Sequence, residues 1–337
     1  MIHAEGLTRE FRVGKETVQA VRGLTLDVEE GELVAFLGPN GAGKSTSLRM
    51  LTTLLIPTSG RATVAGFDVV AAPASVRQRI GYVGQGHGAA DDQHVRDEVV
   101  TQGRIYGMTR IDAAARADEL IDSLELTPLA KRKTSTLSGG QRRRLDVAIG
   151  MVHAPRLLFL DEPSTGLDPQ SRANLWEHLV RLREEHGTTI FLTTHYLEEA
   201  DAMAERVLVI DEGRVIADGS PEELKAGMAG DLITIGTSSP ADAARAARVA
   251  GRLDSPRDIT IDGSTVRLRT VGGATALPGL LRALDAVSVN AVSAEVKRPT
   301  LDDVFLELTG RSLRDAGDIA AESIKQTQTA ETLEVAS

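Results

Sequence analysis

The feature that constrains the fold most is the string Gly-Pro-Asn-Gly-Ala-Gly-Lys-Ser-Thr at residues 38–46, which fits the pattern of a phosphate-binding loop. The apolar segment Leu33–Leu37 runs directly into this string, and residues 45–55 follow with helical character until Pro57. Glycines let backbone N–H groups approach phosphate oxygens closely, and the start of a helix favours negative charge. Strand, glycine loop and helix in this order therefore predict a nucleoside triphosphate site.

The last three residues of this string are expected to contact the phosphates and the metal ion. The Lys44 ammonium is expected to hold the β- and γ-phosphates, the Ser45 hydroxyl to ligate Mg²⁺, and Thr46 to lie near the α-phosphate. The preceding backbone is expected to form the phosphate cradle, with the residues Gly38, Pro39, Asn40, Gly41, Ala42 and Gly43. A glycine-rich turn without function is the alternative, but the whole string and its context fit a phosphate loop.

Two carboxylates follow a second apolar strand, Leu157–Leu160. Asp161, at the strand end, is expected to hold the Mg²⁺ shell. Alternation along the strand turns Glu162 another way, toward the attacking water, so Glu162 is the candidate general base. Paired acids after a strand can also simply cap a loop. The phosphate loop upstream favours the catalytic interpretation, with hydrolysis of the triphosphate as the reaction.

Strands and helices alternate along most of the chain, which is typical of a parallel sheet covered by helices. We therefore expect an α/β nucleotide-binding domain over residues 1–230, with a helical subdomain at about 86–150. Residues 231–310 show the order β-α-β-β-α-β, a split ferredoxin-like pattern of a small α+β accessory domain. Residues 311–337 are polar with few large apolar side chains, so we expect a disordered tail.

The composition of the chain excludes several kinds of partner and site. The net charge of −10 disfavours non-specific binding to nucleic acid, and none is expected as a partner. The chain has no cysteine, which excludes disulfides and thiolate zinc sites. No apolar run approaches the roughly 18–20 residues of a membrane-spanning helix, and the N-terminus lacks the apolar core of a signal peptide. We expect a cytoplasmic protein whose membrane role, if any, comes through a partner.

The segment LSGGQ at Leu137–Gln141 lies between the phosphate loop and the paired carboxylates. Ser138 is a good helix N-cap, and the first N–H groups of the helix, with the helix dipole, favour an anion. The three motifs together, over residues 1 to about 227, resemble the ATP-binding-cassette (ABC) ATPases. The resemblance implies a P-loop NTPase fold and hydrolysis of ATP with Mg²⁺. It also implies that Ser138, Gly139, Gly140 and Gln141 bind the γ-phosphate of ATP held by a second copy, in a head-to-tail homodimer.

The resemblance also assigns roles to residues elsewhere. Gln85 would contact Mg²⁺ or water and report ATP occupancy to a membrane partner, and His195 would donate a hydrogen bond to the γ-phosphate. Phe11 would stack on adenine, with a core phenylalanine as the alternative. Asp168 would lie at the dimer interface, and it can equally cap the helix that starts at Pro169. The segment after Gln85 is more polar and glycine-rich than the family pattern, which leaves the geometry of the partner contact open.

Two further segments, RPTLDDVFLELTG at residues 298–310 and RRRLD at residues 142–146, are similar to the daunorubicin-resistance-type ATP-binding subunits of bacterial exporters. This similarity implies a peripheral protein at the cytoplasmic face of the membrane. Such a protein powers export of a drug, antibiotic, lipid or glycan through a separate integral membrane permease. Its accessory domain is expected to promote dimerisation.

The alternative function is a soluble ABC ATPase of DNA repair, chromosome structure or translation. Zinc-binding repair types need cysteines, chromosome types need a long coiled coil before LSGGQ, and translation types usually carry two cassettes. The sequence shows none of these three features, which disfavours this alternative. A regulatory module without turnover is disfavoured by Glu162 and His195, and a metabolic kinase by LSGGQ. The basic runs Lys131–Lys133 and Arg142–Arg144 are expected to be solvated or to contact nucleotide or partner.

Overall fold

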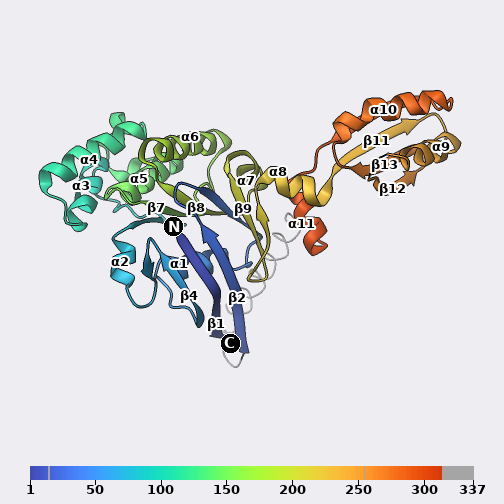
Figure 1. Ribbon diagram of the computed structural model, residues 1–337. Coiled ribbons are helices and arrows are strands. Elements are labelled where there is room, and N and C mark those ends of the chain that lie inside the picture. The colour runs from blue at the N-terminus through green and yellow to red at the C-terminus, as the bar shows by residue number, and fades with distance from the viewer. Residues whose placement is uncertain (14–15, 254, 313–337) are drawn as a thin grey trace, which may run out of the picture. The chain divides into compact units, whose positions relative to one another are not determined.

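The computed structural model describes residues 1–312 except 14, 15 and 254, so the expected tail lies almost wholly outside the described residues. The described chain forms two compact units that divide after Asp218, as Figure 1 lets the reader follow by colour. The division comes earlier than residue 230 because helix α8 (Pro221–Leu224) packs against α11 (Leu301–Thr309), near the end of the second unit.

The first unit contains an antiparallel and a mostly parallel sheet. The antiparallel sheet has the order β2-β1-β4-β5, and its strands are β1 (Ile2–Val13), β2 (Glu16–Val28), β4 (Ser59–Val64) and β5 (Phe67–Asp68). The larger sheet has the order β10-β9-β3-β8-β7-β6, with parallel pairing from β9 to β6. Its strands are β3 (Leu33–Leu37), β6 (Ile80–Val83), β7 (Leu157–Asp161), β8 (Thr189–Thr194), β9 (Arg206–Asp211) and β10 (Arg214–Gly219).

The parallel strands show why the apolar runs of the sequence fold as they do. Every residue of β3, β7 and β8 is buried, because these strands lie inside the sheet and are covered on both faces. The rings of Phe36, Phe159 and Phe191 come from these three strands and contact one another in tilted pairs at 5.6 and 5.7 Å. The predicted α/β fold with a parallel sheet is confirmed. Parallel pairing also brings the carboxyl ends of the three strands to the same edge.

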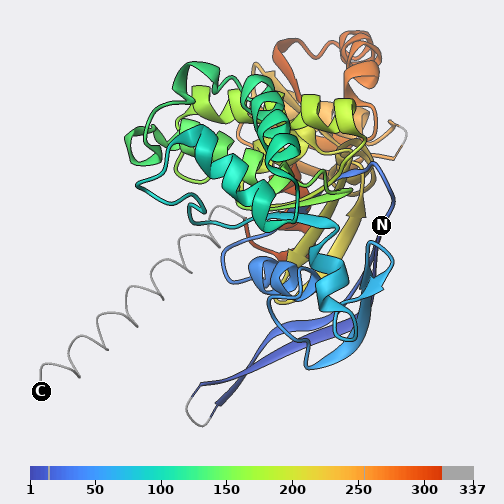
Figure 2. The same ribbon diagram turned by 90° about the vertical axis from the view of Figure 1, so that its left-hand side faces the viewer.

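Helices connect these strands. They are α1 (Lys44–Leu51), α2 (Pro73–Arg77), α3 (Val95–Ile105), α4 (Arg110–Ser123), α5 (Gly139–Met151), α6 (Pro169–His186) and α7 (Leu197–Met203). Both views show α3, α4 and α5 packed together on the side away from the tips of β1 and β2 (Figures 1 and 2), where a helical subdomain was predicted. Helix α1 ends at Leu51 rather than near residue 55, because Thr53 takes a left-handed φ of 63°.

The second unit is a four-stranded sheet with two helices against one face. Its elements are β11 (Asp231–Thr237), α9 (Pro240–Ala250), β12 (Arg257–Asp262), β13 (Thr265–Thr270), α10 (Gly273–Ala286), β14 (Ala291–Lys297) and α11. Neighbouring strands are antiparallel in the order β12-β13-β11-β14. Alternate residues such as Ile233, Ile235 and Leu268 form its core with α9 and α10. Thr300 and Asp303 make the capping box that starts α11.

Close packing of β6 on α5 generates a stability prediction. A Cβ added to Gly81 would lie 2.3 Å from the Gly150 carbonyl oxygen and 2.8 Å from a Leu158 methyl group, so Gly81→Ala should destabilise the first unit by about 1–3 kcal/mol. Urea unfolding can be followed by Trp176, the chain's single tryptophan, which is buried in α6. Gly86→Ala is the control, because a Cβ there meets open space. Equal unfolding midpoints for the two variants would contradict the prediction.

Candidate active site

The phosphate loop adopts a conformation that glycine makes possible. Gly41 and Gly43 have φ values of 81° and 102°, a region that other residues rarely enter. A Cβ on Gly43 would also lie 2.5 Å from the Ala20 carbonyl oxygen. Helix α1 begins directly after Gly43 and has no side-chain cap at its N-terminus. The first N–H groups of α1 are therefore directed toward a ligand anion.

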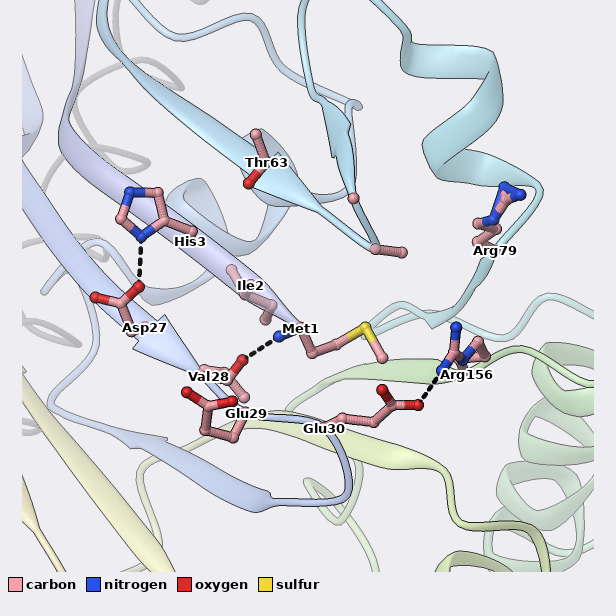
Figure 3. Close-up of a pocket in the computed structure, with 12 residues that line it drawn as sticks. Met1, Ile2, His3, Asp27, Val28, Glu29, Glu30, Thr63, Arg79 and Arg156 are labelled. Atoms are coloured by element: carbon pink, nitrogen blue, oxygen red, sulfur yellow. Dashed lines mark hydrogen bonds and ion pairs between the residues drawn. The ribbon is translucent and has the colours of Figure 1, made fainter.

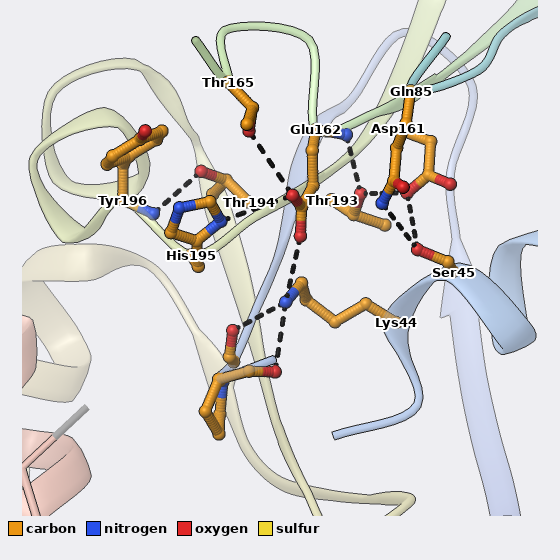
Figure 4. Close-up of polar contacts among 12 residues, drawn as sticks. Lys44, Ser45, Gln85, Asp161, Glu162, Thr165, Thr193, Thr194, His195 and Tyr196 are labelled. Atoms are coloured by element: carbon orange, nitrogen blue, oxygen red, sulfur yellow. Dashed lines mark hydrogen bonds and ion pairs between the residues drawn. The ribbon is translucent and has the colours of Figure 1, made fainter. Parts of the chain in front are cut away.

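Lys44 is held by groups that an incoming phosphate can replace. Its side chain is buried, and its Nζ donates hydrogen bonds to the carbonyls of Gly38 and Pro39 at 2.8 and 3.1 Å (Figure 4). The same Nζ lies 3.3 Å from Glu162 Oε1. Burial lowers the pKa of Lys44, and the carboxylates of Glu162 and Asp161 oppose that effect. The arrangement keeps a cation ready at the place where the sequence predicts the β- and γ-phosphates.

Two other predicted residues, Ser45 and Gln85, lie next to the buried carboxylate of Asp161. Its Oδ1 accepts a hydrogen bond from Ser45 Oγ at 3.0 Å, and Gln85 Nε2 donates to the same Ser45 Oγ at 3.1 Å (Figure 4). Thr193 Oγ1, at the end of β8, also donates to Asp161 Oδ1 at 2.7 Å and accepts from the Glu162 N–H at 2.9 Å. Thr193 thus ties the Asp161 carboxylate to the backbone of Glu162, a role that the sequence did not reveal.

The donor set around Asp161 fits a magnesium ion. Asp161 is 1% exposed, and its Oδ2 is buried without a hydrogen-bond partner among the described residues. A buried carboxylate oxygen without a partner is costly, so it favours a cation. The Ser45 hydroxyl and the Gln85 amide add oxygen ligands of the kind that Mg²⁺ prefers.

Glu162 lies between two cationic or protonatable groups. Its backbone φ of 47° is left-handed, which turns the side chain away from the path of the strand. One oxygen faces Lys44, and the other lies 3.4 Å from His195 Nδ1 and 3.3 Å from Thr165 Oγ1 (Figure 4). Burial raises the pKa of Glu162, but the adjoining His195 and Lys44 outweigh it and lower the pKa to about 2. The carboxylate is therefore charged at neutral pH, as a general base must be.

The LSGGQ segment starts α5 with a capping box. Ser138 Oγ accepts from the Gln141 N–H at 3.3 Å, and Gln141 Oε1 accepts from the Ser138 N–H at 3.0 Å. Ser138 and Gly139 are exposed. A Cβ on Gly140 would lie 2.8 Å from the Ser171 side chain, so the start of α5 touches the start of α6. The helix terminus thus remains open to an anion from outside this chain.

Comparisons with known proteins agree with this geometry. A family model described as "ABC transporter" matches residues 21–165, and one described as "ATP-binding protein DrrA1-3-like, C-terminal domain" matches residues 219–309. The chain is 43% identical over 311 residues to the daunorubicin resistance ATP-binding protein DrrA2 of Streptomyces coeruleorubidus, covering 92% of this chain and 95% of that protein. The chain belongs to the ABC transporter ATP-binding proteins of the daunorubicin-resistance type.

Two other similarities extend this family assignment. The linearmycin resistance ATP-binding protein LnrL of Bacillus subtilis (strain 168) is 34% identical over 317 residues, which is 94% of this chain and 100% of that protein. Among solved structures, the ATP-binding cassette MJ0796, titled as a dimer in a post-hydrolysis state bound to ADP and phosphate, is 27% identical with a TM-score of 0.60. That likeness covers 65% of this chain and 98% of the other chain.

Two residues that the ABC resemblance singled out lie apart from the carboxylates. Phe11, on β1, is half-buried, and the Arg9 guanidinium lies over its ring at 4.7 Å. Asp168 caps α6, since its Oδ1 accepts from the Ser171 N–H at 2.9 Å, and it is exposed. The adenine-stacking role of Phe11 and the dimer role of Asp168 stay predictions.

The arginine run after LSGGQ corrects one expectation. Arg142–Arg144 was expected to be solvated or to contact nucleotide or partner, yet Arg143 is 4% exposed. Its guanidinium donates to the carbonyls of Gly84, Asp161 and Pro163. Arg144 likewise donates to the Leu124 carbonyl. Local sequence shows only three consecutive charges, whereas their acceptors lie far away along the chain.

A cavity of about 410 Å³ lies elsewhere in this ABC domain. It is lined by residues at the start of β1, the end of β2, the turn before β3 and the positions just before β6 and β7, including His3, Asp27, Glu30, Arg79 and Arg156 (Figure 3). Glu30 and Arg156 form an ion pair across it. Because β3 and β7 begin here, the cavity lies at the sheet edge opposite to the phosphate loop and Asp161.

The lowered pKa of Glu162 predicts an acid dependence of stability. A folded-state pKa of about 2, below the ordinary 4.5, means that the carboxylate stabilises the fold above pH 4.5 and loses this effect as the pH falls toward 2. The contribution is up to about 3 kcal/mol at neutral pH. Glu162→Gln cannot titrate, so the difference in unfolding free energy between wild type and variant should change across this pH range. Urea unfolding of both proteins measures it, and a difference independent of pH would contradict the prediction.

Proposed function

We propose that this chain is the ATP-hydrolysing subunit of a bacterial exporter and acts with a separate integral membrane permease at the cytoplasmic face of the membrane. The observation that carries the proposal is the position of Glu162. Its carboxylate is ionised and lies against Lys44 and His195, next to the Ser45–Asp161 pair. A base, a phosphate-binding cation and a metal site within one group are what hydrolysis of ATP requires.

Binding of ATP is proposed to rearrange the contacts of Lys44. The γ-phosphate would replace the Gly38 and Pro39 carbonyls and the Glu162 oxygen that now surround Nζ. Freed from Lys44, the Glu162 carboxylate can accept a proton from the attacking water. His195 can then donate to the γ-phosphate from the other side of Glu162. The ion pair of Lys44 with Glu162 thus keeps both groups charged and in place before the substrate arrives.

Ser45, Asp161 and Gln85 would hold a magnesium ion, which neutralises charge on the β- and γ-phosphates. The Thr193 hydroxyl keeps Asp161 oriented toward Ser45. The side chains of the site are thus positioned by hydrogen bonds before any ligand binds, which reduces reorganisation during the reaction.

We propose a head-to-tail homodimer in which the start of α5 completes the site of the second copy. The exposed Ser138 and Gly139 support this arrangement, because a helix N-terminus facing outward binds an anion supplied from outside. The related cassette with a TM-score of 0.60 is titled as dimeric. Asp168 lies at the exposed start of α6 beside this surface, consistent with a place at the dimer interface.

The permease is proposed to dock on the helical subdomain. Ile105 at the end of α3 and Ile111 near the start of α4 are 70% and 81% exposed, and Tyr106 between them is 44% exposed. Large apolar side chains grouped on a surface mark a site of protein contact. Within the described residues, no helix is both long and apolar enough to cross a bilayer. The relatives are named for resistance to daunorubicin and linearmycin, and we propose a drug, antibiotic, lipid or glycan as cargo.

Replacing the general base tests the function. Glu162→Gln should lower ATP turnover by about a hundredfold or more while ATP still binds, because the carboxylate that accepts the proton is lost and the phosphate loop is intact. With ATP retained, the variant should form a stable dimer on size-exclusion chromatography. It should also co-purify from membranes with an integral membrane protein.

Glu185→Gln is the matched control, because Glu185 is an exposed glutamate on α6 far along the helix from its N-cap. This control should keep wild-type turnover. Full turnover in Glu162→Gln would refute Glu162 as the base. An ATP-stabilised dimer recovered with ribosomes or DNA instead of a membrane protein would overturn the exporter in favour of a non-transport ABC ATPase.

Charged substitutions on the helical subdomain test the docking surface. Ile105→Glu with Ile111→Glu should reduce recovery with the membrane fraction by tenfold or more, since burying two charges in an interface is costly. Basal ATP turnover of the purified chain should stay within about twofold, because both residues lie away from the site. Val70→Glu, at another exposed apolar residue, is the control and should bind membranes normally. Equal recovery of all three proteins would place the permease contact elsewhere.

A further inference from the structure

Helix α5 holds the loop that carries Gln85 at both ends. We define the Gln85 loop as residues 84–88. Arg143 Nη1 donates to the Gly84 carbonyl at 2.6 Å at the beginning of this loop. At its end, Asp146 Oδ1 accepts from the Gly88 N–H at 2.9 Å, and Asp146 Oδ2 lies 3.0 Å from His87 Nδ1. Arg143 and Asp146 are three residues apart, so they project from the same face of the helix.

Both clamping side chains are buried charges, which makes their bonds selective for this geometry. Arg143 and Asp146 are each 4% exposed. Besides Gly84, the Arg143 guanidinium donates to the carbonyls of Pro163 at 2.7 Å and Asp161 at 3.2 Å. A single planar group thus joins the Gln85 loop to the strand end that carries Asp161 and to the residue after Glu162. A lysine presents a point charge and cannot reproduce this fork of donors.

The glycines of the loop point to movement between these fixed ends. Gly84, Gly86 and Gly88 all have ordinary φ values, so none of them needs glycine for its backbone conformation. A Cβ on Gly86 would meet open space, and one on Gly88 would make only an ordinary contact at 3.7 Å with Asp146. This conformation therefore does not require glycine at residues 86 and 88. What glycine supplies there is freedom to adopt a second conformation.

We propose that Arg143 and Asp146 are positioning residues that clamp the Gln85 loop to α5 and so set where the Gln85 amide lies relative to Ser45 and Asp161. The proposal rests on the proposed ATPase function and adds to it a connection between two nucleotides. Ser138 starts the helix whose later turns hold the Gln85 loop. A shift of α5, when Ser138 binds the ATP of a second copy, moves the two anchors of that loop. The clamp thereby links Gln85 in one site to the phosphate bound by the other.

Asp146→Asn tests the clamp with an almost unchanged side-chain shape. In the full chain without nucleotide, we expect amide hydrogen exchange of a peptide covering residues 84–90 to become roughly tenfold faster, because a charge-assisted bond is weakened. With ATP, kcat should fall about tenfold while KM for ATP stays within about twofold, since Lys44 and the phosphate loop are intact. The Mg²⁺ concentration for half-maximal turnover should rise several-fold, because Gln85 faces the metal site.

Asp91→Asn is the matched control. Asp91 is an exposed carboxylate that lies outside the Gln85 loop. It pairs with Arg142 of helix α5, the helix that also carries Arg143 and Asp146. This control should match wild type in exchange, kcat and Mg²⁺ dependence. Arg143→Lys is the second variant and should lower kcat even if its fold, followed by Trp176 fluorescence, stays intact. If Arg143→Lys does not fold, the measurements on Asp146→Asn alone test the clamp.

Three outcomes separate the clamp from the function. Wild-type exchange and wild-type Mg²⁺ dependence in Asp146→Asn would overturn the clamp while leaving the ATPase proposal intact. An equal loss of kcat in Asp91→Asn would also overturn it, since the effect would then come from any contact of α5. A wild-type protein without ATP turnover would refute the proposed function, and the exchange measurement would still decide whether Asp146 restrains the loop.

Discussion

The buried carboxylate of Asp161 is the interaction on which the rest of the site depends. A charge at this depth is tolerated only with hydrogen bonds or a counter-ion, and here Ser45 and Thr193 both donate to one of its oxygens. These two donors come from α1, which follows β3, and from β8, which pairs with β7. Parallel pairing of β3, β7 and β8 makes this possible, because it brings the carboxyl ends of the strands to one edge. The fold therefore concentrates polar groups where the apolar strands end.

The buried pair of Lys44 and Glu162 depends on a balance between the cost of burial and the attraction of opposite charges. Burial lowers the pKa of Lys44 and raises that of Glu162, and each group opposes this effect on the other, with the adjoining His195 further lowering the pKa of the glutamate. Neither partner of such a pair can be removed without leaving the other buried and uncompensated. In the proposed mechanism, phosphate oxygens would supply the negative charge that Glu162 now provides to Lys44. Binding of ATP and release of the Glu162 carboxylate from Lys44 would then occur together.

The sequence predicted those parts of the site that depend on neighbouring residues. The phosphate loop, Asp161 and Glu162 follow from short strings at strand ends, and the buried parallel strands follow from continuous apolar runs. Other parts depend on contacts between distant segments. Arg143 reaches Gly84 across fifty-nine residues, and Thr193 reaches Asp161 across thirty-two. No local pattern distinguishes a threonine that links a carboxylate to the backbone N–H of the next residue from one that merely favours a strand. The strands β4 and β5 were also missed, because their short polar stretches lack a period of two over enough residues.

Charge in this chain is used differently at its surface and in its interior. Exposed ion pairs such as Glu5 with Arg61 contribute little, because water screens them and their side chains lose entropy. The buried Arg143 contacts three backbone carbonyls instead of a carboxylate, so its directions matter more than its charge. A guanidinium has a rigid planar fork, and three fixed carbonyls define one place for it. A movement of helix α5 would therefore shift the Gln85 loop and the residues around Glu162. In the proposed homodimer, this would make α5 the mechanical connection between its own site and the site that it completes.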